Sequence, residues 1–182
     1  LKLARMATGR HRLIGFYDAF HGASLDAISI GGERLFREGV GPLLPGTVHV
    51  PPPLSYRRPF PGYEGLASPE YLDYVMDHEG DVAAFVAEPM RCTTIDIPPA
   101  EYWPAVREVC DRHGALLVFD EIPLCLGRTG AWLATEHTGV VPDILCLGKG
   151  LGGGVFPLAA VLARPDLDVG GHVALGHYTH EK

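Results

Sequence analysis

The sequence has 182 residues, of which 47% are hydrophobic, and its 15 Lys and Arg against 22 Asp and Glu give a net charge of −7. This composition fits one globular domain with a sizeable core, and the absence of basic clusters interleaved with aromatic residues disfavours nucleic-acid binding. No apolar run approaches the roughly 18 residues of a membrane span, and four widely spaced cysteines without a Cys-x-x-Cys pair favour buried thiols in a cytoplasmic, reducing compartment over a disulfide framework or zinc site.

The first third of the chain predicts little regular structure. Residues 1–10 resemble the end of a helix that a glycine stops, and residues 13–17 predict a strand. Residues 31–68 are rich in Gly and Pro, which predicts an extended surface excursion without long elements. Because the chain opens inside a helix and closes on a loop-like segment, we expect it to be a piece of a longer protein.

Helices and strands alternate in the remainder of the chain. Residues 68–80 have a Ser N-cap, a first-turn Pro and a terminal Gly, and residues 102–114 have apolar residues at helical spacing followed by Gly. Short apolar runs without alternation predict buried strands at 82–87, 115–119, 144–148 and 156–163. The pattern predicts an α/β fold with three layers, α/β/α, around a mostly parallel sheet.

An acid and an amine follow two of these strands. Asp120 ends the run ALLVFD, and Lys149 stands between ILCLG and a glycine cluster, so both should meet at the ligand-binding edge of the sheet. Desolvation would lower the pKa of Lys149 and favour a neutral amine that attacks carbonyls. Taken alone, the position is more typical of a solvated lysine at a strand end or of one that binds a phosphate. Asp120 could meet a cationic ring, a metal or an arginine, or it could cap the next turn or pair with Arg128.

Other candidate residues carry weaker signals. Phe20 and His21 follow the first strand, where an aromatic side chain could stack on a planar cofactor or simply join the core. Glu88 is a further acid directly after a buried strand, whereas Glu121 is expected to be structural. Three histidines and an acid near the end of the chain have a spacing that could bind a metal ion, but residues of this kind in a Gly-rich segment are more typical of a solvated loop. They are His172, His177, His180 and Glu181.

Taken in order, these segments resemble the class III aminotransferases, which are pyridoxal-phosphate (PLP) enzymes of fold type I. The ordered series is LKLAR, FHG, EP, LLVFDE, GRTG, PDI with GKGLGGG, and GHYT. The resemblance implies that residues 1–182 form the middle of the PLP-binding large domain. The phosphate-cup region before it and the small C-terminal domain after it are absent from this sequence.

The resemblance implies an aminotransferase that moves an amino group between a small amino compound and an oxo acid. Lys149 would form the internal aldimine with PLP and later move the Cα proton as a general base. Asp120 would pair with the pyridinium nitrogen and keep it protonated, so that the cofactor can act as an electron sink.

The same resemblance assigns roles around the ring. Phe20 would stack on one face, Ile122 would pack on the other, and His21 would lie beside the ring. Glu88 would support the network around Asp120. Thr179 would reach across a homodimer interface to the cofactor phosphate of the partner.

Two departures from the family pattern leave alternatives open. Pro123 replaces a Gln that contacts the cofactor hydroxyl in many members, and the segment around Arg91 lacks an acid that gates a substrate-binding arginine. Arg91 is therefore a candidate for binding an anionic substrate group. One alternative is a PLP-dependent lyase of the same family that acts on an anionic amine, such as a phosphorylated or phosphonate amino alcohol. An alternative of another class is an inactive fragment or binding remnant.

Overall fold

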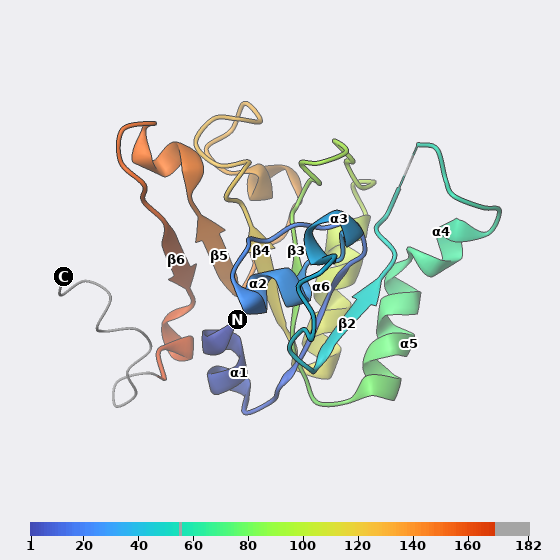
Figure 1. The fold of residues 1–182 in the computed structure, drawn as a ribbon. Helices are drawn as coiled ribbons and strands as arrows, with labels where there is room; N and C mark the ends of the chain where they lie inside the picture. Colours follow the sequence, from blue (N-terminus) through green and yellow to red (C-terminus); the bar gives the residue numbers. More distant parts are fainter. Residues whose placement is uncertain (55, 170–182) are drawn as a thin grey trace.

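The computed structural model describes residues 1–54 and 56–169, which fold around one six-stranded sheet (Figure 1). Its strand order is β2-β1-β3-β4-β5-β6. The first five strands in this order are parallel, and the last pairs antiparallel with its neighbour. The strands are β1 (Arg12–Phe16), β2 (Thr47–Val50), β3 (Val82–Ala87), β4 (Leu116–Asp120), β5 (Ile144–Leu147) and β6 (Ala160–Ala163).

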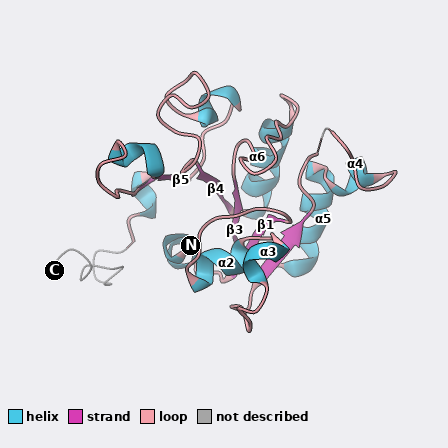
Figure 2. Ribbon diagram, turned by 45° about the horizontal axis from the view of Figure 1, so that its top comes forward, coloured by secondary structure: helices cyan, strands magenta, loops and turns pink. Residues whose placement is uncertain are grey.

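Helices cover both faces of the sheet (Figure 2). On one face α5 and α6 pack over Phe85, Leu117 and Phe119, and on the other α1 packs over the alternate residues of the same strands. The predicted three-layer α/β/α fold is therefore confirmed. The helices are α1 (Lys2–Thr8), α2 (Leu25–Ile30), α3 (Arg34–Arg37), α4 (Tyr63–Leu66), α5 (Pro69–Glu79) and α6 (Tyr102–His113).

Local signals place the helix ends where the sequence predicts them. The Ser68 hydroxyl accepts a hydrogen bond from the Tyr71 N–H at 3.2 Å, so it caps α5 as expected. Gly114 ends α6 with a φ of 60°, a left-handed conformation that glycine adopts without a steric cost. The polypeptide then enters β4 directly, which fixes the distance between α6 and the sheet.

Two regions differ from the sequence prediction. The Gly- and Pro-rich segment does not remain an excursion, because β2 pairs in parallel with β1 and forms an edge of the sheet. The predicted strand at 156–163 is shorter: only Ala160–Ala163 pairs with β5, and three of its four residues are exposed. In the part of the chain that the structure describes, no helix has the length and apolar character needed to cross a membrane.

Candidate active site

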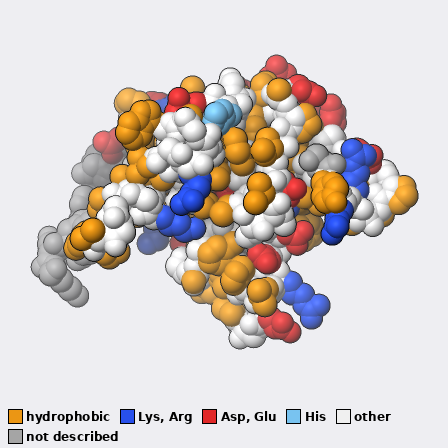
Figure 3. Space-filling view, turned by 90° about the horizontal axis from the view of Figure 1, so that it is seen from above, with side chains coloured by type: hydrophobic (Ala, Val, Ile, Leu, Met, Phe, Trp, Pro, Cys, Tyr) orange, Lys and Arg blue, Asp and Glu red, His pale blue; other side chains and the backbone are white. Residues whose placement is uncertain are grey.

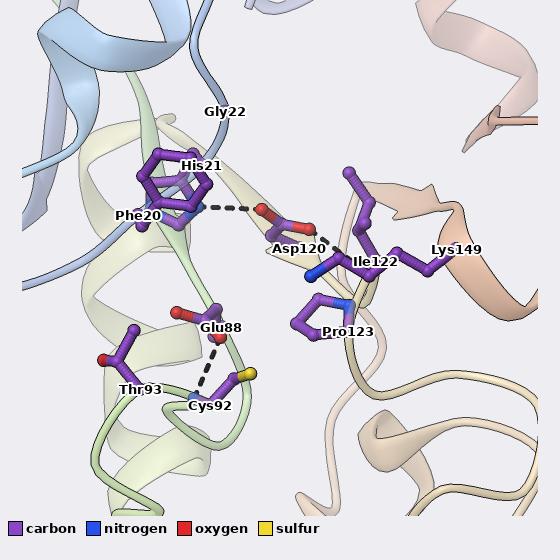
Figure 4. A pocket seen from close by; sticks show the side chains of 10 residues that line it. All are labelled: Phe20, His21, Gly22, Glu88, Cys92, Thr93, Asp120, Ile122, Pro123 and Lys149. Atoms are coloured by element: carbon purple, nitrogen blue, oxygen red, sulfur yellow. Dashed lines mark hydrogen bonds and ion pairs between the residues drawn. The ribbon is translucent and has the colours of Figure 1, made fainter. Parts of the chain in front are cut away.

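Four strands deliver side chains to one cavity at the carboxyl edge of the sheet (Figure 4). Seen from above this edge, apolar side chains cover much of the face, with Lys and Arg side chains among them (Figure 3). We call the cavity the strand-end cavity, and its volume is about 220 Å³. It is lined by Phe20, His21, Gly22, Glu88, Cys92, Thr93, Asp120, Ile122, Pro123 and Lys149.

Asp120 is the central acid of this cavity. It is the last residue of β4, and its side chain is 8% exposed. Its Oδ2 lies 2.9 Å from His21 Nδ1, and its Oδ1 accepts a hydrogen bond from the Ile122 N–H at 3.0 Å. The carboxylate therefore caps the following turn, as one of the alternatives proposed. Its side-chain partner is His21, and the proposed pair with Arg128 does not form among the described residues.

Glu88 and His21 complete a buried polar group beside Asp120. Glu88 follows β3, accepts a hydrogen bond from the Cys92 N–H at 3.0 Å, and has its pKa raised by burial. His21 Nε2 is buried and has no hydrogen-bond partner among the described residues. Since buried polar atoms are normally satisfied, this nitrogen has one hydrogen-bonding position that no described residue uses.

Lys149 directs its amine into the strand-end cavity (Figure 4). It follows β5 by two residues and begins a short 3-10 turn, Lys149–Gly152, with a φ of 44°. The residue is exposed among the described residues. The expectation that Lys149 cannot easily reach water is therefore wrong for the described part of the chain, because the cavity that the amine enters is open to solvent there.

Phe20 and Ile122 lie on opposite sides of Asp120 (Figure 4). Phe20 is half-buried and packs against Phe36 with ring centroids 4.3 Å apart. Ile122 packs against Gly148, where an added Cβ would lie 3.1 Å from an Ile122 methyl carbon. The glycine thus lets Ile122 approach β5 closely.

The neighbouring acid Glu121 has no place in the cavity and holds the next loop together. It is fully buried, and its Oε2 accepts a hydrogen bond from the Ala134 N–H at 2.9 Å. Its Oε1 accepts bonds from the Thr135 N–H at 2.5 Å and the Thr135 hydroxyl at 2.6 Å. These three bonds agree with the expected structural role of Glu121.

Cys92 and Thr93 also line the cavity, although the sequence analysis did not select them. The one sequence signal for these two residues is that they follow Glu88 closely. The hydrogen bond from the Cys92 N–H to the Glu88 carboxylate holds this segment beside the cavity. Thr179 and the C-terminal histidine group fall outside the described residues. Within residues 1–54 and 56–169, no group of three or more His, Cys, Asp or Glu is placed to hold a metal ion.

Known proteins resemble this chain over most of its length. A family model described as aminotransferase class-III matches residues 1–175. The (R)-1-hydroxy-2-aminoethylphosphonate ammonia-lyase of Vibrio splendidus is 44% identical over 199 aligned positions, which cover 100% of this chain and 42% of that protein.

Solved structures show the same arrangement of the chain. An amine transaminase from an uncultivated Pseudomonas species, solved in its PLP-bound form, has a TM-score of 0.84 and 36% identity over 91% of this chain and 40% of that one. An (S)-enantioselective omega-transaminase from Thermomicrobium roseum has a TM-score of 0.82 and 32% identity over 91% and 40%. This chain thus spans about two fifths of the length of these relatives. Since the family model covers nearly all of the sequence, the chain belongs to the class-III aminotransferase family.

Proposed function

We propose that this chain forms the cofactor-binding centre of a PLP-dependent aminotransferase that moves an amino group between a small amino compound and an oxo acid. The observation that carries the proposal is the meeting of Asp120, Lys149 and Phe20 around one cavity. A buried carboxylate, an amine and an aromatic ring suit a planar aldehyde cofactor whose ring nitrogen is protonated.

The described residues fit PLP in three respects. Asp120 is a buried anion whose attached hydrogen bonds fix its orientation, so it suits a protonated ring nitrogen. The unpartnered Nε2 of His21 offers a further polar contact. The apolar side chains of Phe20 and Ile122 lie on opposite sides of Asp120, where they can enclose a flat ring.

PLP would supply the electron sink of the reaction, and the residues of this chain would supply attachment, orientation and proton transfer. Lys149 Nζ would bind the cofactor and, once released from it, would hold and move the proton of the substrate Cα. Asp120 would keep the positive charge at the ring nitrogen. His21 would position Asp120 through the contact of 2.9 Å, and Glu88 would support this group from the neighbouring strand.

A second candidate is a PLP-dependent lyase that releases ammonia from an anionic amine. It is supported by the 44% identity to an ammonia-lyase of a hydroxylated aminoethylphosphonate. It is also supported by Pro123, which lines the cavity without a hydrogen-bonding side chain.

The test uses the full-length enzyme. Borohydride reduction and peptide mapping should place a pyridoxyl group on Lys149, and a Lys149→Ala variant should lack it. A transaminase should consume pyruvate and the amine together without free ammonia, whereas a lyase should release ammonia with no oxo acid present. No pyridoxyl group on the full-length enzyme would contradict both candidates and favour an inactive remnant.

Finer features of the enzyme belong to the same proposal. We propose that residues 1–182 lie within a larger PLP-binding domain, which agrees with the two-fifths coverage of the relatives. We also propose a cytoplasmic homodimer in which Thr179 contacts the partner's cofactor phosphate. The four free cysteines support a reducing compartment. Size-exclusion chromatography with light scattering of the full-length enzyme, and a Thr179→Ala variant with weaker PLP affinity, would test the dimer.

A further inference from the structure

We propose that a second cavity, next to the strand-end cavity, is a binding site for the anionic group of the substrate. We call it the loop cavity; it lies between residues 90–97 and residues 123–129, and its volume is about 460 Å³. Cys92, Pro123 and Lys149 line both cavities. This inference deepens the proposed function and rests on it for the identity of the reacting amine.

Basic residues line the loop cavity without an acidic one. Arg91, Arg128 and Lys149 are lining residues, and no Asp or Glu is among them. Thr129 adds a hydroxyl group, and Ile95 and Ile97 supply apolar surface. Guanidinium groups and a hydroxyl are the usual donors to phosphonate, phosphate and carboxylate oxygens, so the lining fits an anion attached to a small carbon chain.

Arg91 supplies the buried part of this site. Its side chain is 4% exposed, and its Nη2 donates to the Thr94 hydroxyl at 2.7 Å and lies 3.6 Å from Asp96 Oδ2. Backbone bonds between Arg91 and Asp96 hold the loop that carries these groups. The Nε and Nη1 groups are buried without a hydrogen-bond partner among the described residues, which is costly unless a ligand or another segment accepts from them.

Arg128 supplies the accessible part of the site. It lies on the turn 127–130, which is closed by hydrogen bonds from the Gly127 N–H to the Ala131 carbonyl and from the Gly130 N–H to the Gly127 carbonyl. The side chain is exposed and makes no ion pair or hydrogen bond with any described residue. It is therefore available to a ligand that enters the loop cavity.

A third cavity differs from the loop cavity because carboxylates are part of its lining. Arg91 also lines a cavity of about 570 Å³, together with Arg57 and with Asp18, Glu33 and Asp96. The three carboxylates outnumber the two guanidinium groups there, so this lining is less favourable to an anion. An anionic group is therefore directed to the loop cavity, where it also lies next to the amine of Lys149.

The experiment measures anion binding to the full-length enzyme loaded with PLP, so that the phosphate site of the cofactor is already filled. Isothermal titration calorimetry with methylphosphonate and with acetate gives two dissociation constants. Arg128→Gln on the exposed turn and Arg91→Gln should each weaken binding of the preferred anion about 10- to 100-fold, because each loses a charge-assisted hydrogen bond. Arg91→Lys should lose less, and Arg112→Gln, an exposed arginine on α6, should bind as the wild type does.

The outcomes separate this inference from the proposed function. Preference for methylphosphonate or for acetate identifies the anionic group, and either preference supports the site. Wild-type affinity in Arg128→Gln, or no binding of either anion to the wild type, would overturn it. Should Arg91→Gln fail to fold, the Arg128→Gln result decides. Anion binding by an enzyme that turns over no amine would support the site and contradict the proposed function.

Discussion

Replacing Asp120 with Asn removes the charge of this side chain while keeping its shape. The amide oxygen can still accept from the Ile122 N–H, now 3.0 Å from Oδ1, and the amide nitrogen then faces His21. His21 can accept from it at Nδ1 and carry its own proton on Nε2. Both bonds are kept in neutral form, so we expect the free energy of unfolding to fall by only about 1 kcal/mol, the difference between a charged and a neutral hydrogen bond.

The lost charge should instead affect catalysis. A nearby opposite charge shifts a pKa by about 1–3 units, and each unit corresponds to about 1.4 kcal/mol. Without Asp120 the protonated ring nitrogen of PLP would be about 1.4–4 kcal/mol less stable. We therefore expect kcat of the full-length Asp120→Asn enzyme to fall about 10- to 1000-fold at saturating PLP. The assay is steady-state turnover together with thermal unfolding of the cofactor-free enzyme.

The adjacent Glu121 provides a matched control. Glu121→Gln also removes one charge without changing shape, but Glu121 holds Ala134 and Thr135 outside the cavity. Whichever way the new amide turns, its nitrogen faces a backbone N–H, which leaves that donor unpaired at a cost of about 1–3 kcal/mol. We expect a lower thermal midpoint with kcat near that of the wild type.

The two variants should therefore show opposite phenotypes. Wild-type turnover in Asp120→Asn would refute the assignment of this carboxylate to the ring nitrogen. A loss of stability in Asp120→Asn as large as that in Glu121→Gln would refute the argument that its hydrogen bonds survive in neutral form.

Three further predictions concern other parts of the chain. Iodoacetamide should modify the exposed Cys92 and not Cys110, because burial raises the pKa of Cys110 to about 12. Bound PLP should protect Cys92, which lines the strand-end cavity, and labelling of Cys92 that PLP leaves unchanged would contradict its place in that lining. The hydrogen bond from His113 lowers the pKa of Asp73, so this pair adds stability above about pH 4 that is lost as the pH falls through the lowered pKa. The thermal midpoint of Asp73→Asn should therefore fall less in acid than that of the wild type, and parallel curves for the two proteins would contradict this prediction. Ser68→Ala should cost about 1 kcal/mol of unfolding free energy through the lost α5 cap, whereas Ser68→Gly should cost less, and an unchanged midpoint in Ser68→Ala would argue against the cap.

Much of the fold could be predicted because its signals are local. The cap at Ser68 and the left-handed Gly114 fix helix ends through groups a few residues apart. The buried strands are apolar throughout because helices cover both of their faces. By contrast, β2 consists of four residues between Gly46 and Pro51, and its pairing with the distant β1 makes it a strand.

The site was predictable in composition but not in geometry. The parallel topology brings Asp120 and Lys149 to one edge, so their meeting follows from the strand assignment. The exposure of Lys149 depends on the turn after β5, for which no local pattern was decisive. The partners of Arg91 depend on a backbone bridge to Asp96 that closes only in the folded loop.

The strand-end cavity is assembled from the ends of four separate strands, and under our proposal this couples cofactor binding to the stability of the fold. An unfolded chain cannot hold Phe20, Glu88, Asp120 and Lys149 together, so a ligand of this cavity binds the native state alone. Such a ligand at 100 times its dissociation constant adds about 2.7 kcal/mol to the free energy of unfolding. Under our proposal, cells short of vitamin B6 would hold a larger unfolded fraction of this enzyme and degrade it faster, so its abundance would follow its cofactor without any dedicated regulator.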